Sequence, residues 1–454
     1  MSVQRLSQTG LWNLSNQLLV SAWFDLSQDP RKSNLGWIYS VLPINIALGP
    51  IGTLIQLFIL NLHGTVIDIG LAITLFNAIS IPSAIIWGIA TDRYHKRNPI
   101  IFVSYLGVSG ILGLFLFTKT IHGIEVLYAI ISFLSSASAT PLNLLIMETQ
   151  PKSRWTSAFA RLSMISSVGV TLGLLLGVAW GDFLPLYLIM IPLSILSTFS
   201  ALISFLTIKE PSVGFEGAMI VLVRRSFYER LLALPMLFLR IPRASDFNRM
   251  FKSMRFELTR EPLLLYMSII AFYFASGIFN TSLVPSFYEA KITNSEVFLI
   301  LLAGMIVQTI AFNSVAPRVE KRSLKETAVS GLTLRSICYV LVGVSAYLFT
   351  GGLYLGINLI LYPLSSGIAY AAYYAASSVM VFNSLGADKH GSTLGVYSAL
   401  VGLSTMLGSF ISGFVSFYAG YFTTFIIAGF FMAIGAALTS MLSHGGKTSN
   451  HPSS

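Results

Sequence analysis

The segment Gly88-Ile-Ala-Thr-Asp92-Arg93-Tyr-His-Lys96-Arg97 carries four charged side chains within six positions. In the whole chain only 10% of the residues are Asp, Glu, Lys or Arg. On both sides of the segment lie apolar runs that are long enough to cross a bilayer. The pattern predicts a cationic loop between two membrane-spanning segments.

The composition of the chain fits the same class of protein. The chain has 454 residues, 54% of them hydrophobic and 13% aromatic, and a mean hydropathy of +0.75. A soluble domain carries about 25% charged residues. A single soluble core stops growing at roughly 250–300 residues, so it could not bury this much apolar surface. Lipid must therefore solvate most of these side chains, and we predict a polytopic membrane protein.

Twelve windows of the chain are apolar over the roughly 20 residues that a helix needs to span a bilayer. An open sheet would leave backbone groups unpaired in lipid, and the windows are longer than the ~10-residue strands of a membrane barrel. We therefore predict an all-α fold with twelve transmembrane helices. The windows are 36–60, 66–90, 99–118, 124–146, 157–180, 183–207, 262–288, 296–316, 325–349, 352–381, 392–417 and 420–443.

The cations predict which ends of these helices face the cytoplasm. If the N-terminus is inside, 25 of the 28 Lys and Arg residues lie on the cytoplasmic side. Only Lys119 and Lys291 fall outside, and Arg335 lies within a predicted span. This is the positive-inside distribution, so both termini are expected in the cytoplasm. The net charge of +10 then faces the anionic inner leaflet and does not indicate a nucleic-acid partner.

A long polar interval divides the spans into six and six. It contains ten Lys or Arg residues and is too charged to span, so interfacial helices are expected within it. A simple tether between two halves is the favoured role, and the binding of a regulator is the alternative. The predicted parts are a cytoplasmic segment 1–35, an N-terminal six-helix bundle 36–207, a basic linker 208–261, a C-terminal six-helix bundle 262–443 and a cytoplasmic tail 444–454.

The two halves share sequence features at corresponding positions. The spacing R-x-x-K-R occurs after the second span and again after the eighth, at an offset of 225 residues. Gly173 and Gly408 also correspond, at an offset of 235. Two pseudo-symmetric six-helix bundles joined by a long loop are typical of parallel-repeat transporters. The two basic triplets are Arg93, Lys96 and Arg97 in the first half and Arg318, Lys321 and Arg322 in the second.

The segment from Gly88 to Arg97 resembles the G-x-x-x-D-R-x-G-R-[RK] loop motif of the major facilitator superfamily, and it lies after the second span, where that family carries it. His95 replaces the usual glycine, and in the second copy Pro317 replaces the Asp. The resemblance extends to the topology of six plus six helices. It implies that the two bundles rock around a midplane cavity.

The resemblance also implies a breakable latch between the halves that holds one access state closed. Glu148 and Arg154 resemble the acidic–basic pair that follows the fourth span, although their spacing is one residue short. A plain topology anchor is the alternative role of the cations. The predicted latch residues are Gly88, Asp92, Arg93, Lys96, Arg97, Glu148, Arg154, Arg318, Lys321 and Arg322.

The fifth span carries three glycines on nearly one helix face, Gly169, Gly173 and Gly177. Such a face permits close approach of a neighbouring helix. It resembles the fifth-span motif of drug and proton antiporters in the family, although Leu174 and Leu176 replace a proline and a glycine of that motif. Helix packing is therefore the favoured role, with a slight lean toward export.

Polar side chains inside the spans are candidates for contact with a solute, because they are costly when they face lipid. Each of them could instead form a hydrogen bond between helices. Neutral amides and tyrosines suit a neutral or amphipathic solute. The candidates are Asn45, Gln56, Asn77, Asn143, Asn280, Gln308, Asn358, Tyr370, Tyr373 and Tyr374.

Arg335 is the only charge that lies far from both ends of a predicted span. A cation near the bilayer centre costs roughly 2.5–3.5 kcal/mol or more, so Arg335 should face a cavity or snorkel inward. The carboxylates nearest the spans lie near the predicted outer ends, and solvated loop ends are their favoured interpretation. A proton is therefore only a candidate coupling ion, and facilitated diffusion stays open. These carboxylates are Asp68, Glu125, Asp182, Glu289 and Glu296.

Enzymatic motifs do not emerge from the sequence. The segment from Gly445 to Asn450 resembles part of a phosphate loop, but Met441 occupies the position of its first glycine. The histidines and the one cysteine show no metal-binding spacing. We predict a monomeric multi-pass transporter of the cell membrane, without cofactor or metal, that moves a small solute by alternating access. The alternatives are a non-transporting sensor on the same fold and an integral-membrane transferase.

Overall fold

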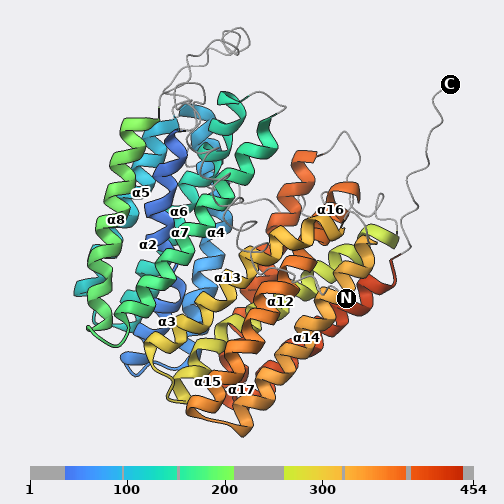
Figure 1. Ribbon diagram of the computed structural model, residues 1–454. Helices are drawn as coiled ribbons and strands as arrows, with labels where there is room; N and C mark the ends of the chain where they lie inside the picture. Colours follow the sequence, from blue (N-terminus) through green and yellow to red (C-terminus); the bar gives the residue numbers. More distant parts are fainter. Residues whose placement is uncertain are drawn as a thin grey trace, which may run out of the picture.

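The computed structural model describes residues 36–94, 97–150, 154–208, 260–319, 323–384 and 390–442. Every regular element in these ranges is helical, and the helices form two groups that lie side by side, blue to green and yellow to red in Figure 1. The first group consists of α2 (Val41–Leu48), α3 (Ile51–Asn61), α4 (Val66–Tyr94), α5 (Arg97–Leu114), α6 (Ile121–Thr149), α7 (Trp155–Trp180) and α8 (Met190–Thr207), with 3-10 turns at Gly36–Ser40, Phe115–Phe117 and Leu186–Ile189. The second consists of α12 (Arg260–Glu289), α13 (Asn294–Val319), α14 (Leu324–Leu348), α15 (Gly351–Tyr362), a π-helical segment Pro363–Ala369, α16 (Tyr370–Ser384) and α17 (His390–Ser440).

The prediction of twelve spans is confirmed. Eleven stretches of the described chain are long and apolar enough to cross a bilayer, and the last of them, Ala399–Ser440, has 42 residues. At 1.5 Å per residue this stretch is about twice as long as a bilayer core is thick. Gly420 has φ 79° and ψ 166°, a conformation that a side chain disfavours, and it bends the chain between two spans. The prediction placed this boundary between residues 417 and 420.

Two of the spans are not uniform helices. The first span is interrupted between α2 and α3, where Pro50 has no amide hydrogen for the helical ladder. The tenth span consists of α15, the π-helical segment and α16. The predicted segments 1–35 and 444–454 and nearly all of the linker 208–261 lie outside the described residues.

Equivalent caps begin the second span of each bundle. Thr65 N donates to Asp68 Oδ2 at 2.7 Å at the start of α4, and Thr293 N donates to Glu296 Oε2 at 2.9 Å at the start of α13. In return, the amides of Asp68 and Glu296 donate to the threonine hydroxyls at 3.5 and 3.4 Å. These capping boxes lie 228 residues apart, and they hold both carboxylates at exposed helix starts.

The same offset relates the turns that precede these caps. His63 and Lys291 have φ angles of 62° and 60°, which are uncommon for residues other than glycine. These two are the only non-glycine residues with positive φ among those described. A shared strained turn followed by a shared cap supports the pseudo-symmetry of the two bundles.

Glycines bring corresponding helices together inside each bundle. A Cβ at Gly173 in α7 would meet the carbonyl oxygen of Ile46 in α2, and a Cβ at Gly408 in α17 would meet the carbonyl oxygen of Phe274 in α12. Because the obstructing atoms are backbone, each helix pair depends on the missing side chain. The fifth and first spans thus pack as the eleventh and seventh spans do.

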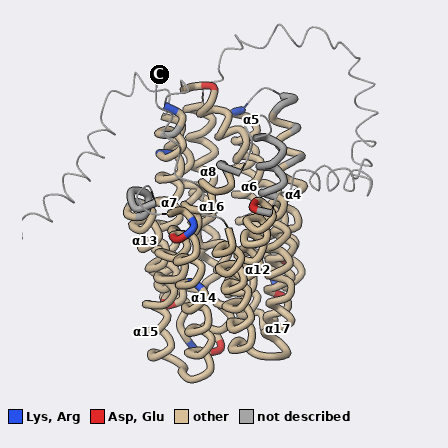
Figure 2. The backbone as a smooth tube through the Cα atoms, turned by 90° about the vertical axis from the view of Figure 1, so that its right-hand side faces the viewer, with Lys and Arg blue, Asp and Glu red and all other residues tan. Residues whose placement is uncertain are grey.

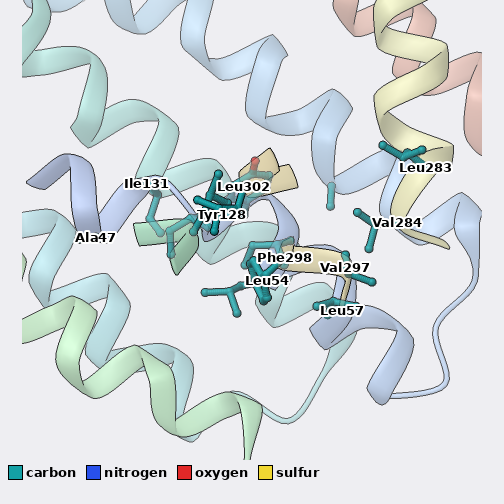
Figure 3. Close-up of a cluster of buried hydrophobic side chains, with 14 of the residues drawn as sticks. Ala47, Leu54, Leu57, Tyr128, Ile131, Leu283, Val284, Val297, Phe298 and Leu302 are labelled. Atoms are coloured by element: carbon teal, nitrogen blue, oxygen red, sulfur yellow. The ribbon is translucent and has the colours of Figure 1, made fainter. Parts of the chain in front are cut away.

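The two bundles contact each other at one end and also farther along α4 and α17, where a Cβ at Gly402 would come within 3.1 Å of the side chain of Ile81. We call the end where α5 and α14 begin the basic end, and the end where α4 and α13 begin the far end. Toward the far end, Leu54 and Leu57 of α3 share a buried cluster with Val284 of α12 and with Val297 and Phe298 of α13, as Figure 3 shows. Most of the described backbone in Figure 2 carries no Asp, Glu, Lys or Arg. This part of the contact between the bundles is therefore apolar.

Candidate functional site

The interior of the second bundle contains a buried cation. Arg335 occupies the middle of α14 and is only 3% exposed. Its Nε donates to the hydroxyl of Tyr339 at 2.7 Å. The two residues are neighbours because positions i and i+4 share one face of a helix. The sequence predicts Arg335 as a cavity charge, but it gave no role to Tyr339.

Three aromatic rings surround the guanidinium of Arg335. Its Cζ lies 4.8 Å from the ring centre of Phe272 in α12, 5.3 Å from that of Tyr339 and 5.3 Å from that of Tyr370 in α16. All three distances are within the range of a cation–π interaction. We call Arg335, Phe272, Tyr339 and Tyr370 the arginine cage. Three different spans contribute to it.

No carboxylate among the described residues forms an ion pair with Arg335 of the arginine cage. The ion pairs among the described residues are Arg97 with Glu148 and His122 with Glu125. Arg335 Nη1 is buried and has no hydrogen-bond partner in these ranges. A buried charge is costly unless it is paired and hydrogen-bonded. The cage therefore holds a cation with unused donors.

A second layer of rings supports the cage. Phe279 stacks on Tyr339 with centroids 3.7 Å apart, and Tyr373 lies against Phe272 with centroids 4.2 Å apart. On the other side, Tyr374 stacks on Tyr370 at 5.6 Å and is 41% exposed. The predicted tyrosines of the tenth span thus lie around Arg335. The rings extend from a fully buried layer to an exposed one.

A glycine and an irregular helix place α16 against the cage. A Cβ at Gly331 would come within 2.8 Å of the carbonyl oxygen of Ala369 and 3.0 Å of Tyr373 N, so α14 and α16 approach closely one turn before Arg335. The π-helical segment Pro363–Ala369 ends directly before Tyr370. Such segments are frequent at functional sites. No pattern in the sequence predicted this one.

Three of the predicted pathway amides bond to their own helix. The Nδ2 atoms of Asn45, Asn77 and Asn358 donate to the carbonyl oxygens four residues earlier at 2.8, 2.9 and 2.9 Å. Asn45 also reaches Ser166 Oγ at 3.4 Å. The Oδ1 atom of the buried Asn358 has no partner in the described ranges. Asn358 therefore keeps one acceptor for another group.

The other predicted amides lie apart from one another. Gln56 is 7% exposed, and its Oε1 has no partner among the residues that the structure describes. Gln308 is half-buried, whereas Asn143 and Asn280 are exposed. None of these amides makes a hydrogen bond with another in the described ranges. Their role in a solute pathway stays a prediction.

The described part of the latch lies inside the first bundle. Arg97, 8% exposed, forms an ion pair with Glu148 through Nη2 at 2.7 Å. Its Nη1 donates to the carbonyl oxygen of Thr91 at 2.7 Å. These contacts join the end of α4, the start of α5 and the end of α6. Glu148 thus pairs with Arg97, and Arg154 is exposed at the start of α7.

For the remaining predicted latch residues the structure describes no side-chain contact. Gly88 has open space around it within α4, since nothing lies within 4 Å of the position that a Cβ would take. A role in holding the two halves together therefore stays a prediction for this group. The side chains of Asp92, Arg93 and Arg318, and the whole of Lys96, Lys321 and Arg322, lie outside the described residues.

The glycine face of α7 has two neighbours. Gly169 lies against α2, where a Cβ would come within 2.9 Å of the carbonyl oxygen of Leu42. Gly177 lies against α13 of the other bundle, where a Cβ would come within 2.6 Å of the ring of Phe298. Next to this contact, Ser295 Oγ donates to the carbonyl oxygen of Val178 at 2.8 Å. The same face therefore packs within its bundle and closes the far end.

A second contact closes the far end on the opposite side. A Cβ at Gly70 in α4 would come within 3.0 Å of the Cα of Gly413 in α17. Gly70 and Phe298 are 228 residues apart, as the two capping boxes are, so this contact corresponds to the one between α7 and α13. The two bundles are thus held together at the far end by a symmetric pair of close contacts.

Two repeated six-span bundles that meet at one end, with a polar group buried at mid-span, have the fold of a membrane transporter. Residues 36–364 match the family model of the Major Facilitator Superfamily, which is more than half of the chain. The chain belongs to this superfamily. The resemblance of the loop motif at Gly88 is therefore confirmed.

Solved structures share this fold. A structure of the nucleoside transporter NupG has 15% identity and a TM-score of 0.65, over 90% of this chain and 99% of that one. A bacterial homologue of the human lysosomal transporter Spinster, inward-facing and unoccupied, has 15% identity and a TM-score of 0.65, over 90% and 95%. The peptide transporter POT in complex with alafosfalin has 12% identity and a TM-score of 0.69, over 90% and 93%. At these identities the likeness concerns the fold alone. No curated protein sequence matches the chain.

Proposed function

We propose that this protein carries a small amphipathic solute across the membrane by alternating access. The observation that supports this proposal is the symmetric closure of the far end, where Gly70 meets Gly413 and Gly177 meets Phe298. Contacts between two separately packed bundles can open while each bundle keeps its own core. Alternating access requires this kind of separable contact.

The solute would bind between the bundles or within the second one, where Arg335 and its rings lie. The similar structures named above include a nucleoside transporter and a peptide transporter. These differ widely, so the substrate of this chain has to come from its own residues. The lean toward export rests on the glycine face of α7, which resembles the motif of antiporters.

The proposal places a monomer in the cell membrane with both termini in the cytoplasm. The basic end, which begins α5 at Arg97, would then face the cytoplasm, as the positive-inside rule predicts. A proton is the candidate coupling ion. The His122–Glu125 pair, with Nδ1 and Oε2 3.0 Å apart, lies at the start of α6, near the far end. Its Oε1 atom is buried without a partner in the described ranges.

Flux in proteoliposomes tests the proposed function. Purified protein is reconstituted and assayed with a broad panel of labelled amphipathic solutes, with and without a pH gradient, against protein-free vesicles. Asp92→Asn, in the loop motif, is expected to lose most of the flux. Absence of flux for every solute would contradict the proposal and favour the sensor. Flux that ignores the pH gradient would favour facilitated diffusion.

A further inference from the structure

The charge of Arg335 has no counterpart in the described part of the chain, although its side chain is almost completely buried. In a low-dielectric interior an unpaired cation is costly, and proteins usually pair it. A structural arginine would use its donors on neighbouring carbonyl or carboxylate groups. Here only Nε has a hydrogen bond in these ranges, and Nη1 has none.

We propose that the arginine cage is the binding subsite for the anionic group of an organic solute. The proposal rests on the proposed transport function and names its substrate class, an amphipathic organic anion. With Nε bonded to Tyr339, the guanidinium keeps its Nη1–Nη2 edge, which matches a carboxylate or phosphate in a planar, bidentate geometry. The hydrogen bond to Tyr339 fixes the orientation of the guanidinium plane before the solute arrives.

The aromatic rings of the cage restrict which kind of solute body can lie next to the anionic group. Phe272, Tyr339 and Tyr370 present faces to the guanidinium and exclude water from it. Phe272 and Tyr339 are completely buried, so the solute cannot pass on their side. A flat or apolar body next to the anionic group would contact the remaining ring, Tyr370. A neutral solute, which the amides and tyrosines of the sequence also suit, would leave the arginine unpaired.

The approach to the subsite follows the exposed side of the cage. Tyr370 is half-buried and stacks on the exposed Tyr374, and Phe312 of α13 lies edge-on to both at 6.2 and 6.0 Å. These rings form an aromatic path from the surface of the bundle to Arg335. Tyr370 follows directly after the π-helical segment Pro363–Ala369, a kind of irregularity that is frequent at functional sites. Tyr370 therefore forms the wall of the subsite on its exposed side.

Binding of matched probes to the purified full-length protein tests the proposal. The probes share one phenyl-alkyl body: 4-phenylbutyrate, 4-phenylbutyl phosphate, the neutral 4-phenylbutanamide and the cationic 4-phenylbutylamine. Affinities are measured by isothermal titration calorimetry in a neutral detergent. We expect the wild type to bind at least one of the two anions about tenfold or more tightly than the amide, because a charge-assisted pair is stronger than a neutral hydrogen bond. The preferred anion distinguishes a carboxylate from a phosphate substrate.

Substitutions locate this selectivity. Arg335→Gln is expected to remove the preference for the anion, and Arg335→Lys to keep part of it, because lysine keeps the charge without the planar fork. The matched control is Arg161→Gln. Arg161 also donates to a tyrosine, with Nη2 3.0 Å from the hydroxyl of Tyr39, but this hydrogen bond is exposed. The control should bind every probe as the wild type does.

The outcomes separate this proposal from the proposed function. Equal affinity of the wild type for the anions and the amide overturns the subsite, even if Arg335→Gln fails to fold. So does an unchanged anion preference in a folded Arg335→Gln variant. If the Arg335→Gln variant carried neutral solutes at the wild-type rate, the proposed transport function would hold and the proposed anion subsite would be refuted. Anion binding that depends on Arg335, without flux of any solute, would support the anion subsite and refute the proposed transport function.

Discussion

The contact between α12 and α17 at Gly408 allows a sharp test of the bundle packing. In Gly408→Ala the new Cβ would meet the carbonyl oxygen of Phe274 and would come within 3.1 Å of Ile278 N. Both obstacles are backbone atoms, so no side chain can rotate away and the two helices have to separate. Gly110→Ala in α5 is the matched control, because nothing lies within 4 Å of its Cβ position.

The expected magnitude follows from two opposing effects. Replacing glycine with alanine inside a helix favours the helix by about 1 kcal/mol, and this gain applies to both variants. Forcing an extra carbon into a close-packed contact costs about 1–3 kcal/mol, and this cost applies only to Gly408→Ala. The difference between the two variants is therefore about 1–3 kcal/mol, with Gly408→Ala the less stable.

The assay is reversible unfolding in mixed micelles, with the fraction of SDS varied and helix content followed by circular dichroism. Gly173→Ala, in the corresponding contact with Ile46, should resemble Gly408→Ala because the two bundles repeat the same packing. If Gly408→Ala and Gly110→Ala differ by less than about 0.5 kcal/mol, within the usual scatter of neutral substitutions, the described helix contact is wrong.

Three other predictions concern the two ends of the bundles and the interior of the second one. Arg97→Gln and Glu148→Gln should each lower the free energy of unfolding by about 1.5–3 kcal/mol, and the double variant by less than the sum, in the same SDS assay; additive losses would contradict the ion pair. Gly413→Leu should force the far end apart and increase maleimide labelling of a cysteine that replaces the buried Val66 in a cysteine-free background, whereas unchanged labelling would show that the contact is not a gate. Cys338, which is 2% exposed, should react with maleimide only after denaturation, and rapid labelling of the native protein would refute its burial.

The number and order of the spans could be predicted because each span depends on its own residues. The boundary near Gly420 followed from the hydropathy, and the structure interrupts the helix there, at a glycine with non-helical φ and ψ. The carboxylates at predicted outer ends were interpreted as solvated loop ends. For Asp68 and Glu296 the structure adds that they cap helices, through partners only three residues away.

The site was only half visible in the sequence. Arg335 stood out because a lone charge in an apolar span is conspicuous, and the tyrosines of the tenth span because they are clustered. Phe272 and Phe279 could not be singled out, since a phenylalanine in a membrane span is ordinary. Likewise, the glycine face of α7 indicated close packing but did not reveal that Gly177 faces the other bundle.

The sequence by itself determined that this chain has twelve helices in two similar sets, with its cations concentrated at one end. Lipid offers no hydrogen bonds, so each span must satisfy its backbone internally, and about 20 consecutive apolar residues suffice to encode it. Only the tertiary structure decided which faces meet. The ring of Phe272, the guanidinium of Arg335 and the ring of Tyr370 come from three helices, and side chains so distant in the chain become neighbours only when the helices pack.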